Sequence, residues 1–65
     1  MSNYYVVQMI FDCGRIDTQI LKEGDALARG YRDGYYEEHL TFDIFVDGFT
    51  THEAAEKFKV ETVGA

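Results

Sequence analysis

The first strong pattern in the chain is an apolar, β-branched and aromatic run from Tyr4 to Asp12, which reads YYVVQMIFD. Such residues are enriched in strands, and the scarcity of polar positions is typical of a strand buried on most of both faces. Residues 12–14, Asp-Cys-Gly, then form a turn signal, because glycine supplies the positive φ of a three-residue hairpin loop with a bulge. The pattern predicts a hairpin whose return strand covers Arg15 to Lys22.

A second interpretation remains open for the segment after this turn. Ile16, Thr18 and Ile20 share one face of a strand, which favours the hairpin. Positions 20, 24, 27, 28 and 31 also fall at helical spacing, so a helix beginning near Asp17 is the alternative. The hairpin is the preferred interpretation and gives the element order β-β-α-β-α, whereas the alternative gives β-α-β-α.

Capping signals predict two short helices. Asp25 is an acceptable N-cap for a helix that extends through Arg32. Further along, Thr50 and Glu53 have the spacing of a capping box, in which each side chain bonds the other residue's backbone N–H. This box places the second helix at residues 51–58.

The clearest strand covers His39 to Asp47, where apolar residues occupy every second position. Its other face, with Asp43 and Asp47, is half acidic. The apolar face is expected to share one core with the first strand and both helices. The expected core residues are Val7, Met9, Phe11, Leu27, Leu40, Phe42, Ile44, Val46 and Phe58.

Together these elements predict a single α+β domain over residues 1–65, a small antiparallel three-stranded sheet with two short helices on one face. The tail at residues 59–65 is expected to add a short strand or to fray. A chain of 65 residues buries only about 60% of its surface on folding, which leaves no room for a deep catalytic cavity.

Composition narrows the class of protein further. With 46% hydrophobic and 15% aromatic residues, the chain is too apolar for a disordered tail. The longest uncharged run, Met1 to Phe11, contains polar residues and lacks a basic flank, so neither a membrane span nor a signal peptide is predicted. We therefore expect a soluble cytoplasmic protein.

The residues that usually carry catalysis or bind metals do not form a known arrangement. His39 and His52 are thirteen positions apart on separate predicted elements, and the single cysteine, Cys13, allows neither an internal disulfide nor a four-ligand zinc site. Asp43 and Asp47 lie on an open strand, where nothing raises a carboxyl pKa as a general acid requires. The sequence predicts a protein that is not an enzyme and holds no metal or cofactor.

The distribution of charge is the most informative feature. The 24 residues from Asp33 to Glu56 contain no Lys or Arg and carry a charge of −7, whereas the other 41 residues sum to +1. Residues two apart on a strand share a face at about 6.6 Å spacing, so Asp43 and Asp47 belong to one acidic row. Tyr31, Tyr35, Tyr36 and Phe45 lie in or beside this stretch.

An acidic face with exposed aromatic rings repels nucleic acid phosphates, which argues against direct binding of DNA or RNA. The same face suits a basic partner, since complementary potentials speed association and tyrosines supply rigid contact area. The expected partner is a basic nucleic-acid-binding protein or complex. The expected contact residues are Asp33, Tyr35, Tyr36, Glu37, Glu38, Asp43, Phe45 and Asp47.

In size and composition the chain resembles the small acidic phage-encoded inhibitors of host defence, the anti-CRISPR and anti-restriction proteins of the DNA-mimic type. The resemblance implies a non-enzymatic inhibitor, in the host cytoplasm, that covers the DNA-binding surface of a nuclease or CRISPR-type complex. Such a protein would be a monomer or a weak dimer.

Two other interpretations of the same features remain open. The acidic side is also what a plain solvated surface looks like in a small soluble protein. Alternatively, the protein is a structural or assembly module that pairs through an exposed sheet edge, with Tyr4 to Phe11 as the edge strand. Salt distinguishes the inhibitor from the module, because screening weakens a charged interface much more than an apolar one.

Overall fold

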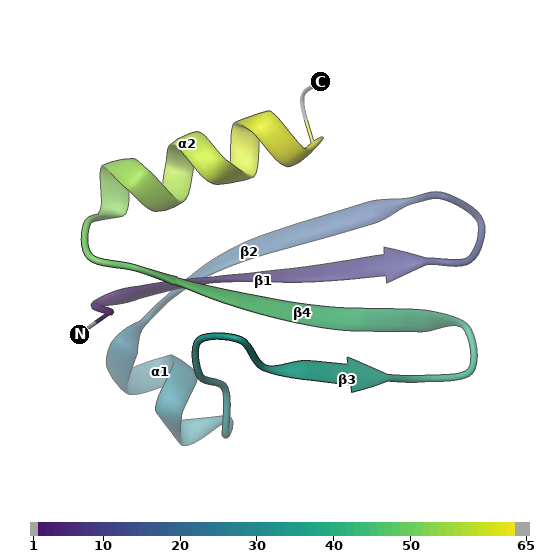
Figure 1. The fold of residues 1–65 in the computed structure, drawn as a ribbon, viewed down its shortest axis with the longest axis horizontal. Coiled ribbons are helices and arrows are strands. Elements are labelled where there is room, and N and C mark those ends of the chain that lie inside the picture. The colour runs from purple at the N-terminus through teal and green to yellow at the C-terminus, as the bar shows by residue number, and fades with distance from the viewer. Residues whose placement is uncertain (1, 64–65) are drawn as a thin grey trace.

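The computed structural model describes residues 2–63, which form a four-stranded antiparallel sheet and two helices (Figure 1). The elements are β1 (Tyr4–Phe11), β2 (Ile16–Lys22), α1 (Glu23–Ala28), β3 (Tyr36–Glu38), β4 (Phe42–Phe49) and α2 (His52–Val63). The strands lie in the order β2-β1-β4-β3, so β1 is central and pairs with β2 on one side and β4 on the other. The predicted α+β class is confirmed, but the prediction of three strands is wrong.

The hairpin between β1 and β2 forms as its turn residues predict. Phe11 donates its backbone N–H to the carbonyl of Arg15 at 2.8 Å, and Gly14 donates to the carbonyl of Phe11 at 2.9 Å. Gly14 has a φ of 94°, in the region that glycine adopts without strain. The interpretation of residues after Asp17 as a helix is therefore wrong.

The missing strand, β3, lies immediately before the predicted His39–Asp47 strand. β3 and β4 form a second hairpin, whose turn closes where His39 donates its N–H to the carbonyl of Phe42 at 2.9 Å. Leu40 is at the tip of this turn and 98% exposed, so its predicted place in the core is wrong. The alternation of apolar residues continued through the turn, which hid the boundary between the two strands.

The sheet has two covered faces, which we call the α1 face and the α2 face. On the α1 face, the buried core consists of Tyr5, Val7, Leu21, Ala26, Ile44 and Val46. On the α2 face, Val6 and Ala55 are fully buried, and the rings of Phe49 and Phe58 lie 5.1 Å apart. The prediction of both helices on one face is wrong, because β1 is apolar on both sides and each side needs its own cover (Figure 1).

Helix α1 is shorter than predicted and begins earlier. It starts at Glu23, two residues before the expected N-cap Asp25, and its N-cap Lys22 makes no side-chain cap hydrogen bond. It ends at Ala28 rather than Arg32, because Gly30 takes a φ of 81° that an α-helix does not contain. Leu27, expected in the core, is 57% exposed.

Helix α2 begins with a cap that is shifted by one residue. The side-chain oxygen of Thr51, not Thr50, accepts the N–H of Ala54 at 3.1 Å, so the predicted capping box with Glu53 is wrong. The helix runs to Val63 rather than to position 58, and the predicted strand or fraying of residues 59–63 is wrong; residues 64 and 65 lie outside the described part. Neither helix of the described chain has the length and apolar character that crossing a membrane requires.

Candidate functional site

The sheet divides the eight predicted contact residues between its two faces. Strand alternation puts five of them on the α2 face, and we call these five the acidic aromatic surface: Tyr36, Glu38, Asp43, Phe45 and Asp47. Tyr35 and Glu37 lie toward the α1 face instead, and Asp33 is in the loop after α1. Glu37 and Glu38, both expected to contact the same partner, point to opposite faces, because both belong to β3 and neighbouring strand residues alternate.

The acidic aromatic surface has a pair of rings at its centre. Tyr36 of β3 lies opposite Phe45 of β4, and their ring centroids are 4.8 Å apart. Tyr36 is 52% exposed, and its hydroxyl lies 3.5 Å from a carboxylate oxygen of Asp43. Burial and then the charges of Asp43 and Glu38 raise the pKa of Tyr36, so its hydroxyl stays protonated and remains a hydrogen-bond donor.

At one end of this ring pair, two carboxylates face each other across the strands. Glu38 pairs directly with Asp43, and directly opposed residues on one face have Cβ atoms about 5 Å apart. Like charges at such a position destabilise a sheet. Within residues 2–63, the ion pairs involve Asp17, Glu37 and Glu56, so no base compensates these two carboxylates.

A second carboxylate pair lies beyond the other end of the rings. Asp33 accepts the backbone N–H of Gly48 at 3.0 Å, which holds its carboxylate beside the end of β4. Burial and then the charge of Asp33 raise the pKa of Asp47. Negative charge is therefore concentrated at both ends of the aromatic centre.

Helix α2 leaves this part of its face open. It packs on β2, β1 and β4, and among the described residues it makes no contact with β3. Tyr36 and Glu38 are exposed, whereas Asp43, Phe45 and Asp47 are half-buried. The acidic aromatic surface is thus accessible to a partner.

On the α1 face, the carboxylate of Glu37 contacts two neighbouring side chains of the same chain. It accepts a hydrogen bond from the Tyr35 hydroxyl at 2.5 Å and lies 2.7 Å from Nε2 of His39, whose ring stacks on Phe42 at 4.4 Å. The Tyr35 hydrogen bond, and then the charge of His39, lower the pKa of Glu37 against the opposing effect of burial. These contacts join residues 35–42 to one another and so stabilise the second hairpin itself. The spacing of residues in the sequence did not indicate this role for His39.

The two acidic groups with shifted pKa values should affect stability with opposite dependence on pH. The raised folded-state pKa of Asp47 gives a stabilising contribution that is complete below the unfolded value of about 3.9 and is lost as the pH rises through the folded value. Glu37, with its lowered pKa, contributes stability above about 4.3, which is lost as the pH falls through its folded value. Asp47→Asn should gain stability relative to the parent as the pH rises, and Glu37→Gln should lose it.

Urea unfolding of both variants and the parent over a series of pH values measures this difference. If the two variants departed from the parent in the same direction, the assignment of the two environments would be incorrect.

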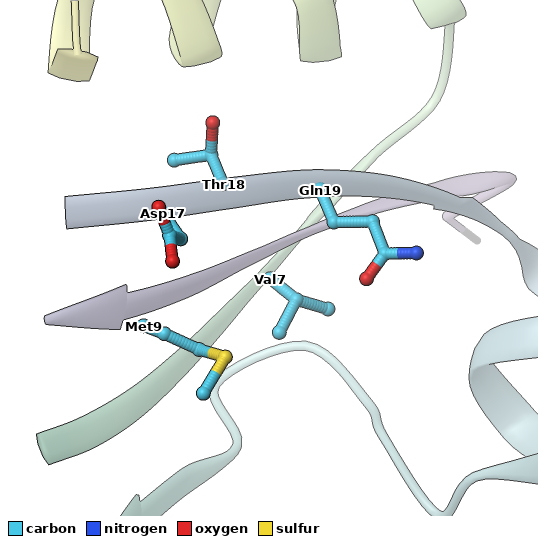
Figure 2. A pocket seen from close by; sticks show the side chains of 5 residues that line it. All are labelled: Val7, Met9, Asp17, Thr18 and Gln19. Atoms are coloured by element: carbon cyan, nitrogen blue, oxygen red, sulfur yellow. The ribbon is translucent and has the colours of Figure 1, made fainter.

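The α1 face carries a shallow hollow. It has a volume of about 370 Å³ and is lined by Val7, Met9, Asp17, Thr18 and Gln19 (Figure 2). Figure 2 shows the side chain of Thr18 on the opposite side of the sheet from Val7, Met9 and Gln19. Its one carboxylate, Asp17, is paired with Arg15 at 2.7 Å, so the lining lacks a free acid or base.

Residues 2–63 contain no group of three or more His, Cys, Asp or Glu side chains that could hold a metal ion. Comparison with known proteins gives no match to a family model, a curated protein or a solved structure.

Proposed function

We propose that the protein acts by binding, without turnover, to the basic surface of a nucleic-acid-binding protein and competes there with the nucleic acid. The observation that carries this proposal is the opposed pair Glu38 and Asp43 beside the exposed ring of Tyr36, with no base among the described residues to compensate it. A protein surface that keeps two like charges opposite each other loses stability, and a cationic partner removes that cost.

The chemistry of the surface fits arginine and lysine. A guanidinium group makes charge-assisted hydrogen bonds to carboxylates and also stacks on aromatic rings. The surface offers both, since the rings of Tyr36 and Phe45 lie between carboxylates at each end. Tyrosine further provides large contact area at a low cost in conformational entropy.

The arrangement of carboxylates supports competition with nucleic acid. One DNA strand presents a phosphate about every 3.4 Å of helix axis, whereas carboxylates in one strand row are at least about 6.6 Å apart. A single row is therefore too sparse. Glu38 on β3 adds a second row beside Asp43 on β4, at the strand separation of about 4.8 Å.

The partner class that we propose is a nuclease or CRISPR-type defence complex, which follows from the resemblance in size and acidity to phage-encoded inhibitors. Inhibition would then result from occupying the DNA-binding surface. The acidic aromatic surface is small, so a partner with clustered arginines is the best fit.

In the alternative interpretation as an assembly module, the strand expected to form the sheet edge is wrong. Its expected edge strand, Tyr4 to Phe11, is β1, which is paired on both sides and has no free edge. The edges of the sheet are β2 and the three-residue β3.

The purified protein should show no measurable affinity for duplex DNA or RNA at about 0.15 M salt, because its largest patch of one charge repels phosphates. A gel-shift titration measures this directly. A complex at micromolar protein would contradict the role of the acidic aromatic surface as a mimic of nucleic acid.

The proposed function is tested by capture and competition. The protein is immobilised and exposed to a nuclease-treated extract of the cells in which it is expressed, and bound proteins are eluted with duplex DNA or with salt. We expect a nucleic-acid-binding protein that both treatments release, and whose DNA binding, once it is purified, falls as the acidic protein is added. Retention of full DNA binding at saturating acidic protein would reject the proposal.

A further inference from the structure

The outer edge of β2 presents unpaired backbone groups. In an antiparallel pair, residues alternate between bonding their neighbour and pointing away from it. Hydrogen bonds from Phe11 to Arg15 (2.8 Å) and from Glu23 to Asn3 (2.9 Å) fix the odd-numbered residues toward β1. The N–H and C=O groups of Ile16, Thr18 and Ile20 therefore point outward, and residues 2–63 provide no backbone partner for them beyond the sheet.

This edge lacks most of the features that block strand addition. Natural edge strands are protected by shortness, proline, bulges or a covering element. β2 has seven residues and no proline, and its pairing with β1 is continuous from Tyr4↔Lys22 to Ile10↔Ile16. The opposite edge, β3, has only three residues and is protected by its length.

We propose that a second copy of this chain pairs with this edge, so that two β2 strands run antiparallel about a two-fold axis in a continuous sheet of eight strands. A register centred on Thr18 satisfies the outward groups of both strands. It sets Ile16 opposite the partner's Ile20 and Thr18 opposite the partner's Thr18, all on the α2 face. β-branched pairs and Thr–Thr pairs of this kind are favourable across strands.

The side chains on the other face are compatible with the same register. Asp17 then lies opposite the partner's Gln19, which can donate to the carboxylate. No two like charges lie directly opposite each other, because this register sets Arg15 opposite the partner's Leu21 and Lys22 opposite the partner's Gly14.

Charge does not oppose the pairing, although the whole chain carries −6. Residues 15–22 contain Arg15 and Lys22 against Asp17 and sum to +1. The acidic aromatic surface is on β3 and β4, so five strand spacings, about 24 Å, separate the two β4 strands of a dimer. That distance exceeds the Debye length of about 8 Å at physiological salt, and the dimer leaves both acidic surfaces accessible.

Sedimentation equilibrium over a range of protein concentrations tests the dimer. We expect a dimer that persists at high salt, and in Thr18→Pro a dissociation constant raised by about ten-fold or more, because both hydrogen bonds across the two-fold axis lose their donor. The N–H of Thr18 does not bond β1, so at a concentration at which the parent is monomeric the circular dichroism spectrum and thermal transition of this variant should match those of the parent. A parent that stays monomeric at its highest soluble concentration would overturn the proposal.

Disulfide trapping checks the register independently. In a Cys13→Ser background, Thr18→Cys should form a covalent dimer on mild oxidation, since directly opposed residues of this kind have Cα atoms about 5.5 Å apart. Leu40→Cys, at the exposed tip of the other hairpin, reports random collisions. Cross-linking at position 40 as efficient as at position 18 would reject pairing through β2.

Discussion

Ile44→Asp is expected to unfold the protein. Ile44 is 7% exposed in the core of the α1 face, where it lies opposite Met9 in β1. Truncating a buried isoleucine already costs about 2–5 kcal/mol, and an unpaired carboxylate adds a desolvation cost. A single core of this size rarely supplies more than about 3–5 kcal/mol of stability. Circular dichroism should therefore show no cooperative thermal transition in this variant.

Leu40→Asp is the matched control, since it makes the same kind of substitution four residues away on a side chain that is 98% exposed. Its free energy of unfolding should stay within about 0.5 kcal/mol of the parent. A folded Ile44→Asp, or a Leu40→Asp that unfolds, would mean that the boundary between the β3–β4 turn and β4 is misplaced.

Reversing the charge of Asp43 and Asp47 together, to lysine, should abolish competition with nucleic acid on the captured partner. The change puts two cations on a surface that is proposed to meet cations, so association slows and the complex weakens. The fold should survive, because a lysine at position 43 lies opposite Glu38 and replaces a like-charge pair with an attractive one. Titration of the partner's DNA binding with parent and variant measures the effect.

The control is a double variant with the same change in net charge, made outside the acidic aromatic surface. Asp25 and Glu61 are exposed on the two helices, outside the acidic aromatic surface, and Asp25→Lys/Glu61→Lys should compete as the parent does. If both double variants lost competition equally, net charge alone would account for binding. If neither lost it, the acidic aromatic surface would be a plain solvated surface.

Local signals in the sequence predicted the elements that depend on local chemistry. The first hairpin follows from a glycine that takes a positive φ, and the inward side of β4 follows from the alternation of Phe42, Ile44 and Val46. β3 was missed because its three residues, Tyr-Glu-Glu, carry too short a pattern to register as a strand. Leu40 extended the alternation of β4 across a turn, which moved the predicted start of the strand from Phe42 to His39.

The assignment of side chains to faces depended on pairing that spans the chain. Val6 and Val7 are adjacent and both buried, which agrees with the predicted burial of this strand on both faces, but the sequence did not show that one helix covers each face. The separation of Glu37 from Glu38 likewise follows from β3 being a strand. The sequence gives the number of charges in this region. Which carboxylates lie opposite each other depends on the register between β3 and β4.

The central position of β1 also constrains the order in which the chain folds. Its contacts with β4 join residues as far apart as Tyr4 and Phe49, so they close a loop that spans most of the chain. Contacts between such distant residues slow folding, because loop entropy is lost before they form. During synthesis the β1–β2 hairpin emerges first, with the other side of β1 open until β4 leaves the ribosome. Until then the nascent chain exposes an apolar strand edge that a chaperone or a neighbouring nascent chain is able to bind.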